Sequence, residues 1–218
     1  MTAGRPPARL GVLLSGRGSN FLAIDDAIAR GELPARIAVV ISNQPEAPGL
    51  ERARERGLPA LCLPHRGLRR AEHDRQLIAA LREHQVEWVC LAGYLRIVGP
   101  ELVGAFPERI LNIHPSLLPA FPGLDAQRQA FDHGVKISGC TVHLVDTGLD
   151  TGPIVVQRAV DVAAAESAAE VAAKILEVEH GAYVEALRRL LTEPFRLAGR
   201  RLRFGGHEEK SEKNRIEG

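Results

Sequence analysis

The stretch RLGVLLSGRGSN, residues 9–20, decides the fold of this 218-residue chain. Its first part is apolar at consecutive positions, which is typical of a parallel strand covered on both faces. Its second part carries two glycines and leads into an amphipathic segment at 20–30, with Asn20 as the predicted N-cap. A strand, a glycine turn and a helix in this order indicate the opening unit of an α/β fold.

The same alternation continues through the N-terminal half of the chain. Four further runs are apolar at consecutive positions and predict strands: 36–42, 60–63, 87–94 and 109–113. The segments 47–56 and 69–85 have helical character and predict the helices between them.

The pattern changes in the C-terminal half. A short helix is predicted at 122–134, and the strands 139–146 and 154–160 are separated by a Gly- and Asp-rich turn, which favours an antiparallel pair. Ser167 and Glu170 match the capping box that opens a long helix. The sequence therefore predicts a Rossmann-like, open, mostly parallel twisted sheet with helices on both faces and an antiparallel C-terminal part.

Composition narrows the class of protein. The 28 basic and 27 acidic residues leave a net charge of +1, so no global nucleic-acid or membrane footprint is expected. No segment approaches membrane-spanning length, and the three cysteines lack metal-site spacing, which favours reduced, buried thiols in a cytoplasmic protein.

The loop SGRGSN, residues 15–20, predicts a phosphate site. Gly16 and Gly18 permit a tight turn and close approach of a ligand, while Ser19 and Asn20 add side-chain donors at a helix N-terminus. A tight turn without a ligand is the alternative.

This loop is a poor match to the signatures of dinucleotide and ATP sites. Phe21 stands where the third glycine of the dinucleotide fingerprint belongs, and the second predicted strand ends in Ser42 and Asn43 rather than in an acidic residue. The lysine of an ATP-binding loop is also missing. A single phosphate monoester is therefore the favoured ligand.

The stretch ILNIHPSLLP, residues 110–119, predicts a reactive site. Asn112 and His114 lie two positions apart, so they share one face at the carboxyl end of a strand, where α/β sheets bind their ligands. Imidazole titrates near neutral pH, and an amide can donate to a developing oxyanion. Ser116 lies close by, and the SLLP sequence favours a cis Leu118–Pro119 bond.

A carboxylate partner for the histidine is expected from VHLVDTGLDTGPIV, residues 142–155. Asp146 and Asp150 are the candidates, and Asp150 sits in a Gly-flanked turn that could approach the histidine. Two ordinary turn aspartates are the alternative.

Covalent and metal-assisted chemistry are both disfavoured. Ser116 has no nucleophile elbow, and Cys140 has no neighbour that would stabilise a thiolate. His143 could join His114 and Asp150 around a metal, but no ligand spacing supports this, so no metal is expected. Asn, His and Asp without a nucleophile indicate direct transfer between two bound substrates.

With NIHPSLLP followed by HLVDTGLDTGP, the sequence resembles the folate-dependent formyltransferases. Within that family it is most similar to the members that act on glycinamide ribonucleotide. The resemblance runs from about residue 9 to residue 200 and includes SGRGSNF, ISNQPEAPGLERA, LAGYLRIVGP, PGLDAQRQA and EHGAY.

The resemblance implies roles for individual residues. The implied catalytic residues are Asn112, His114 and Asp150, and the implied phosphate-binding residues are Gly18, Ser19 and Asn20. Glu179 is implied to contact the ribose, and Ser116 and His143 are possible supporting residues. The implied folate-binding residues are Arg70, Leu95, Arg96, Ile97, Val98, Asn112, Asp146, Thr147, Gly148, Leu149 and Asp150. Arg69 is a rival to Arg70.

The implied reaction transfers the formyl group of 10-formyltetrahydrofolate, a co-substrate, to the amine of N1-(5-phosphoribosyl)glycinamide in purine biosynthesis. The implied partners are these small molecules, and the chain is expected to be a monomer or homodimer. One domain is expected at 1–204, with a phosphate-binding half at 1–100, a catalytic and folate-binding half at 101–204, and a polar flexible tail at 205–218.

Four other readings remain as rivals. Methionyl-tRNA formyltransferases carry a further C-terminal RNA-binding domain, and formyltetrahydrofolate hydrolases carry a regulatory domain before the first strand, so chain length disfavours both. A non-catalytic binding module of the same fold and an NAD-dependent oxidoreductase are the others.

Overall fold

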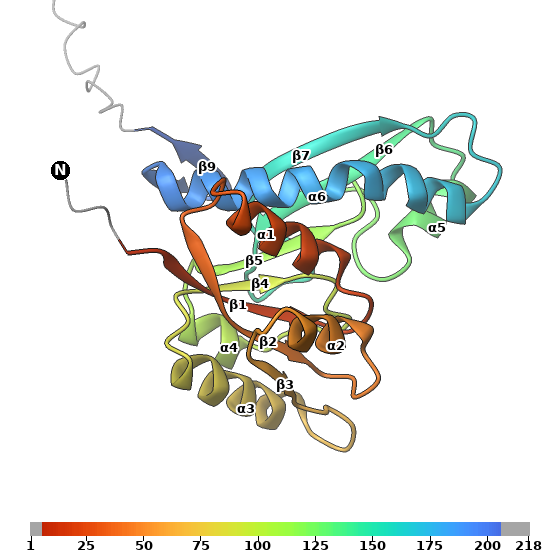
Figure 1. Cartoon of the computed structure of the whole chain (residues 1–218). Coiled ribbons are helices and arrows are strands. Elements are labelled where there is room, and N and C mark those ends of the chain that lie inside the picture. The colour runs from red at the N-terminus through yellow and green to blue at the C-terminus, as the bar shows by residue number, and fades with distance from the viewer. Residues whose placement is uncertain (1–5, 206–218) are drawn as a thin grey trace, which may run out of the picture.

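The computed structural model describes residues 6–205, which form one nine-stranded sheet covered by helices (Figure 1). The strands are β1 (Ala8–Leu14), β2 (Ala35–Ser42), β3 (Ala60–Cys62), β4 (Trp88–Leu91), β5 (Ile110–His114), β6 (Ile137–Leu144), β7 (Ile154–Asp161), β8 (Phe195–Ala198) and β9 (Arg201–Phe204). The helices are α1 (Ser19–Ala29), α2 (Pro48–Glu55), α3 (Arg70–Glu83), α4 (Pro100–Ala105), α5 (Ala126–Asp132) and α6 (Ala168–Thr192).

The strand order is β3-β2-β1-β4-β5-β6-β7-β9-β8. From β3 to β5 the neighbours are parallel, whereas β5, β6 and β7 pair antiparallel. The predicted mixed sheet, with its antiparallel C-terminal pair, is confirmed. Because the chain leaves β1 toward β2 and returns on the other side as β4, the switch point lies between β1 and β4, where such folds bind ligands.

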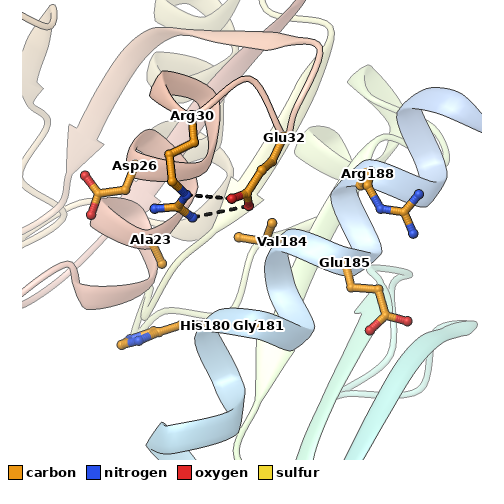
Figure 2. Close-up of a pocket in the computed structure, with 9 residues that line it drawn as sticks. All are labelled: Ala23, Asp26, Arg30, Glu32, His180, Gly181, Val184, Glu185 and Arg188. Atoms are coloured by element: carbon orange, nitrogen blue, oxygen red, sulfur yellow. Dashed lines mark hydrogen bonds and ion pairs between the residues drawn. The ribbon is translucent and has the colours of Figure 1, made fainter.

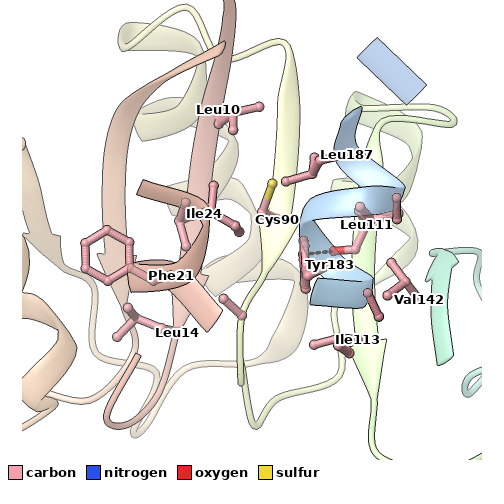
Figure 3. Packing of buried hydrophobic residues seen from close by; sticks show 14 of the residues in the cluster. Leu10, Leu14, Phe21, Ile24, Cys90, Leu111, Ile113, Val142, Tyr183 and Leu187 are labelled. Carbon is pink, nitrogen blue, oxygen red and sulfur yellow. Dashed lines mark hydrogen bonds between the residues drawn. The ribbon is translucent and has the colours of Figure 1, made fainter. Parts of the chain in front are cut away.

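Two hydrophobic cores lie on opposite faces of this sheet. In β1, Val12 belongs to the core under α1, α2, α5 and α6, and its neighbour Leu13 belongs to the core under α3 and α4. Figure 3 shows the first core, in which Phe21 of α1 and Tyr183 of α6 pack against the central strands. Burial on both faces explains why these strands are apolar at consecutive positions.

Three elements were not predicted: α4, β8 and β9. Pro100 opens α4, a position that favours proline, but the six-residue helix fully buries only Leu102 and carries little periodic signal. β8 and β9 form a hairpin whose exposed positions are mostly arginines, and β9 meets β7 through a single pair, Ile154 with Arg201.

The predicted N-cap of α1 is wrong, and that of α6 is confirmed. Gly18, not Asn20, precedes α1, and its φ of 74° is one that glycine adopts without strain. Ser167 caps α6 by accepting a hydrogen bond from Glu170 N. The capping box is not reciprocal, because the Glu170 carboxylate accepts from Glu166 N instead.

Tyr183 fastens α6 to the sheet. Its fully buried hydroxyl lies 3.0 Å from Leu111 O of β5 (Figure 3), and 3.2 Å from Leu91 O of β4. One side chain therefore holds the long helix against two neighbouring strands.

Other expectations have mixed outcomes. The three cysteines are free, and burial raises the pKa of the Cys90 and Cys140 thiols to about 12, which agrees with inert thiols at both sites. Cys62 is only half-buried, so the prediction of a buried thiol is wrong there. The Leu118–Pro119 bond is cis, as predicted. Across residues 6–205, none of the helices has the length and apolar character needed to cross a bilayer. The predicted flexible tail lies, beyond Gly205, outside the described residues.

The two tyrosines of the chain give a matched test of the α6 attachment. Tyr183→Phe should lower the free energy of unfolding by about 1 kcal/mol, because it removes one buried hydrogen bond. Tyr94→Phe should change it by less than about 0.5 kcal/mol, because the buried Tyr94 hydroxyl has no described hydrogen-bond partner. Urea denaturation monitored by circular dichroism measures both, and equal effects would contradict this assignment.

Candidate active site

The pairing of β5 with β6 creates the centre of the site. In this antiparallel register Asn112 lies opposite His143 and His114 lies opposite Thr141. Directly opposed side chains share a face of the sheet, so the predicted same-face pair on β5 gains a histidine from β6. His114 and His143 are buried, with 5% and 2% of their surface exposed.

His143 fixes the orientation of the Asn112 amide. Its Nδ1 lies 3.0 Å from Leu144 O, which can only accept, so Nδ1 carries the proton and Nε2 is the acceptor. Asn112 Nδ2 lies 3.2 Å from that Nε2 and donates to it. The amide has a second N–H on the same nitrogen, which is available to an acceptor in the site.

His114 is held between a carbonyl and a carboxylate. Its Nε2 donates to Phe121 O at 2.8 Å, which leaves Nδ1 as the ring nitrogen that faces the Asp150 carboxylate. Nδ1 lies 3.4 Å from Asp150 Oδ2, and the same oxygen accepts from Gly123 N at 2.8 Å. The other Asp150 oxygen lies 3.8 Å from His143 Nε2. The predicted Asn, His and Asp are thus brought together around one point.

The Ser116 hydroxyl donates to backbone carbonyls of its own loop. This fully buried hydroxyl lies 2.5 Å from Ala120 O and 3.3 Å from Phe121 O, the carbonyl that also binds His114. The Ser116 carbonyl accepts from the Thr141 hydroxyl at 2.7 Å. These bonds shape the loop that holds the imidazole.

The glycine loop meets α6 beside this point. Asn20, in the first turn of α1, donates from Nδ2 to Glu179 Oε2 at 3.0 Å. The Asn20 Oδ1 is buried and has no partner among the described residues. Burial raises the pKa of Glu179, and the bond from Asn20 opposes that shift. The residues implied to hold phosphate and ribose are therefore adjacent, although no described contact tests their roles.

The implied folate segment, residues 95–98, lies on the opposite side of the switch point, after β4. Leu95 and Ile97 expose 73% and 50% of their surface, an unusual amount for large apolar side chains in one loop. The side-chain stem of Arg70 passes close to Gly99, which follows this segment. Its rival Arg69 is paired with Glu72 at 2.6 Å, so the geometry favours Arg70.

The loop between β6 and β7 carries the rest of the implied folate residues. Thr147, Gly148 and Leu149 are exposed at its tip. Asp146 accepts from Gly148 N at 3.0 Å and from the Thr151 hydroxyl at 2.7 Å, and so closes the turn that presents Asp150. The contacts of Asp146 are within its own loop.

Two hollows mark the surface. A recess of about 260 Å³ reaches Asp150 and is lined also by Leu118, Pro119, Gly152, Ile154 and Arg200. A larger groove of about 580 Å³ lies between α1 and α6 and contains none of the predicted site residues (Figure 2). Its Arg30 and Glu32 pair with each other at 2.6 Å. Neither hollow is lined by Asn112 or His114, so the candidate site is located by the meeting of these side chains with Asp150 and not by a hollow.

Metal chemistry has no support in the described part of the chain. No group of three or more His, Cys, Asp or Glu side chains there could hold a metal ion. The prediction of a metal-free reaction stays a prediction.

Several supporting residues were not predicted. Ser15 accepts from Leu95 N at 2.8 Å, Asp74 accepts from Gly99 N at 2.7 Å, and Thr141 accepts from Leu118 N at 3.0 Å. Their partners lie 23 to 80 residues away in sequence, so no local pattern marks them. Asp74 had one usable signal, a carboxylate on the apolar face of its helix.

The acceptor role of His143 predicts that it resists protonation. Burial lowers the pKa of His143 below the ordinary histidine value of about 6.5, which keeps Nε2 free to accept from Asn112. Below about pH 6.5 this histidine is protonated in the unfolded chain but stays neutral to a lower pH in the folded chain. His143 therefore lowers the free energy of unfolding as the pH falls below about 6.5, and it has no such effect at higher pH. An NMR titration of the ring protons, assigned with His143→Gln, should give a midpoint below 6.5. A midpoint at or above 6.5 would contradict the assigned tautomer.

Comparison with known proteins supplies the family. The sequence profile described as formyl transferase matches residues 8–187. Phosphoribosylglycinamide formyltransferase of Bacillus subtilis is 40% identical over 184 residues, which are 84% of this chain and 94% of that protein. The trifunctional purine biosynthetic protein adenosine-3 of Drosophila pseudoobscura pseudoobscura is 43% identical over 196 residues, but this chain, 88% covered, spans only 14% of its length.

The fold agrees with these relatives. The crystal structure of glycinamide ribonucleotide transformylase 1 from Symbiobacterium toebii superposes with a TM-score of 0.90 at 47% identity, covering 94% of this chain and 97% of that one. Since the family profile matches most of the sequence and the fold agrees throughout, the chain belongs to the formyl transferase family.

Proposed function

We propose that this chain transfers the formyl group of 10-formyltetrahydrofolate to the amine of N1-(5-phosphoribosyl)glycinamide, giving the formylglycinamide ribonucleotide and tetrahydrofolate in purine biosynthesis. Two relatives of nearly the same length as this chain carry names for this activity. The observation that supports the proposal is the meeting of Asn112, His114 and Asp150, and we assign one ligand surface to the loop after β1 and another to the segment after β4.

Each surface suits one substrate. On one side, backbone N–H groups at the start of α1 and the Glu179 carboxylate suit a phosphorylated ribose, with Gly18, Ser19 and Asn20 nearest the phosphate. On the other side, exposed apolar side chains beside Arg70 suit a flat aromatic donor that ends in a carboxylate. The reacting atoms then meet at the centre.

The reaction needs no covalent enzyme intermediate. The amine nitrogen attacks the formyl carbon, the new C–N bond forms, and the carbonyl oxygen becomes an oxyanion that accepts the second N–H of Asn112. The bond from the formyl carbon to N10 then breaks, and the proton lost by the amine is delivered to N10. His114 Nδ1 and Asp150 are the groups that move this proton.

The proposal also covers the co-substrate, the partners, the assembly, the location and the two halves of the domain. Formyl-folate acts as co-substrate without a metal, the partners are small molecules, and the assembly is a monomer or a homodimer. The free cysteines are consistent with a reducing compartment, and the cytoplasm is the proposed location. Residues 1–100 supply the phosphate-binding half and residues 101–204 the catalytic and folate-binding half.

A formyl-transfer assay tests this function. Tetrahydrofolate release should require both substrates in the wild type. It should fall about 10²–10⁴-fold in His114→Ala, which loses the acid–base group, and about 10²–10³-fold in Asn112→Ala, which loses the oxyanion donor.

The control distinguishes the rival activities. Tetrahydrofolate formed equally fast without the ribonucleotide would indicate a hydrolase. Donor binding without turnover would indicate a binding module or another acceptor, and binding of NAD(H) alone would support the oxidoreductase reading.

The two glycines of the loop give a matched test of the phosphate site. At Gly18 an added Cβ would meet Gly49, Leu14 and Phe21 at 3.2–3.3 Å, at a φ of 74°, whereas at Gly16 nothing lies within 4 Å. Gly18→Ala should raise the KM for the ribonucleotide about 5- to 30-fold, because the left-handed conformation costs about 1–2 kcal/mol with a side chain. Gly16→Ala should leave it within about twofold. Steady-state kinetics measures both, and equal effects would contradict the assignment of this loop to the phosphate site.

A further inference from the structure

The segment that follows β4 depends on side chains for its position. Among the described residues, no backbone–backbone hydrogen bond reaches residues 94–98. Backbone bonds occur only at its ends, where Ser15 N donates to Gly93 O and Val103 N donates to Gly99 O. The segment presents the large apolar side chains of Leu95 and Ile97 to solvent.

Two side-chain acceptors hold the segment, one at each end. The Ser15 hydroxyl accepts from Leu95 N at 2.8 Å. The Asp74 carboxylate accepts from Gly99 N at 2.7 Å. The only other described bond from the segment, from Arg96 Nη2 to Leu68 O, is long at 3.4 Å.

The burial of the Asp74 carboxylate at this position is energetically unfavourable. Asp74 exposes 1% of its surface and lies on the inner face of α3 with the apolar Leu77 and Leu81. A buried carboxylate is unfavourable unless it is paired or hydrogen-bonded, and an apolar residue would suit this face better. Burial raises its pKa, which reflects the same cost.

Gly99, the partner of Asp74, leaves room for the carboxylate because it has no side chain. A Cβ on Gly99 would lie 2.3 Å from Asp74 Oδ2 and 3.1 Å from the Arg70 stem, so only glycine admits the carboxylate here. Gly99 has a φ of −95°, a conformation open to any residue, so space and not backbone strain requires glycine.

We propose that Asp74 is a positioning residue that holds the segment Leu95–Val98 through Gly99 N–H and thereby sets the affinity for the formyl donor without contacting it. The proposal rests on the proposed function, which assigns this segment to the donor. A loop displaced by a fraction of an ångström loses affinity for the ligand that it contacts, while the chemistry at Asn112 and His114 is left in place.

Four variants test the proposal in the formyl-transfer assay. Asp74→Ala should raise the KM for 10-formyltetrahydrofolate about tenfold, with kcat and the KM for the ribonucleotide within about twofold. Gly99→Ala should do the same, because the new methyl group displaces the carboxylate. Asp74→Asn keeps an acceptor for Gly99 N and should stay within about threefold. Gly104→Ala, in the adjacent α4 with nothing within 4 Å of its Cβ, should match the wild type.

The results separate the proposal from the function on which it rests. A wild type without ribonucleotide-dependent formyl transfer would refute the proposed function. An active wild type refutes the positioning role if Asp74→Ala and Gly99→Ala leave the donor KM unchanged, or if they change both KM values and kcat alike. Thermal unfolding shows whether each variant is folded, and if Asp74→Ala does not fold, Gly99→Ala and Asp74→Asn decide the question.

Discussion

The antiparallel pairing of β5 with β6 is the constraint on which the candidate site depends. Because β6 returns antiparallel along β5, it ends at Leu144 opposite Leu111, and its following loop folds back over the sheet toward the carboxyl end of β5. This return sets His143 against Asn112 and brings Asp150 to His114. One reversal of strand direction therefore assembles residues that lie up to 38 positions apart.

A chain of hydrogen bonds holds the polar groups of the site in place. His143 orients an amide, the Phe121 carbonyl orients His114, and Ser116 shapes the loop that provides that carbonyl. Each bond uses a group that is buried and therefore costly to leave unpaired. Each side chain of the candidate site is thus hydrogen-bonded to a neighbouring group, which is the usual requirement for a preorganised site.

Much of the fold and the centre of the site could be predicted from sequence, for identifiable reasons. Continuous apolar runs revealed strands buried on both faces, and the spacing of Asn112 and His114 revealed a shared face. The failures have a common cause. The side chain of Asn20 looks like a local cap, but it binds Glu179 across 159 positions, and the partner of Asp74, Gly99, lies 25 positions away. Short α4 and the arginine-rich β8 and β9 lack the periodic burial that a pattern can detect.

The two outer strands of the sheet limit how copies of this chain can meet. β3 and β8 are only three and four residues long, and each follows a proline, Pro59 and Pro194, which has no N–H to offer. Such short edge strands offer few backbone groups for pairing, so the sheet is poorly suited to extension by further strands. Self-association of the described residues would then use the helical faces or the loops and not the borders of the sheet.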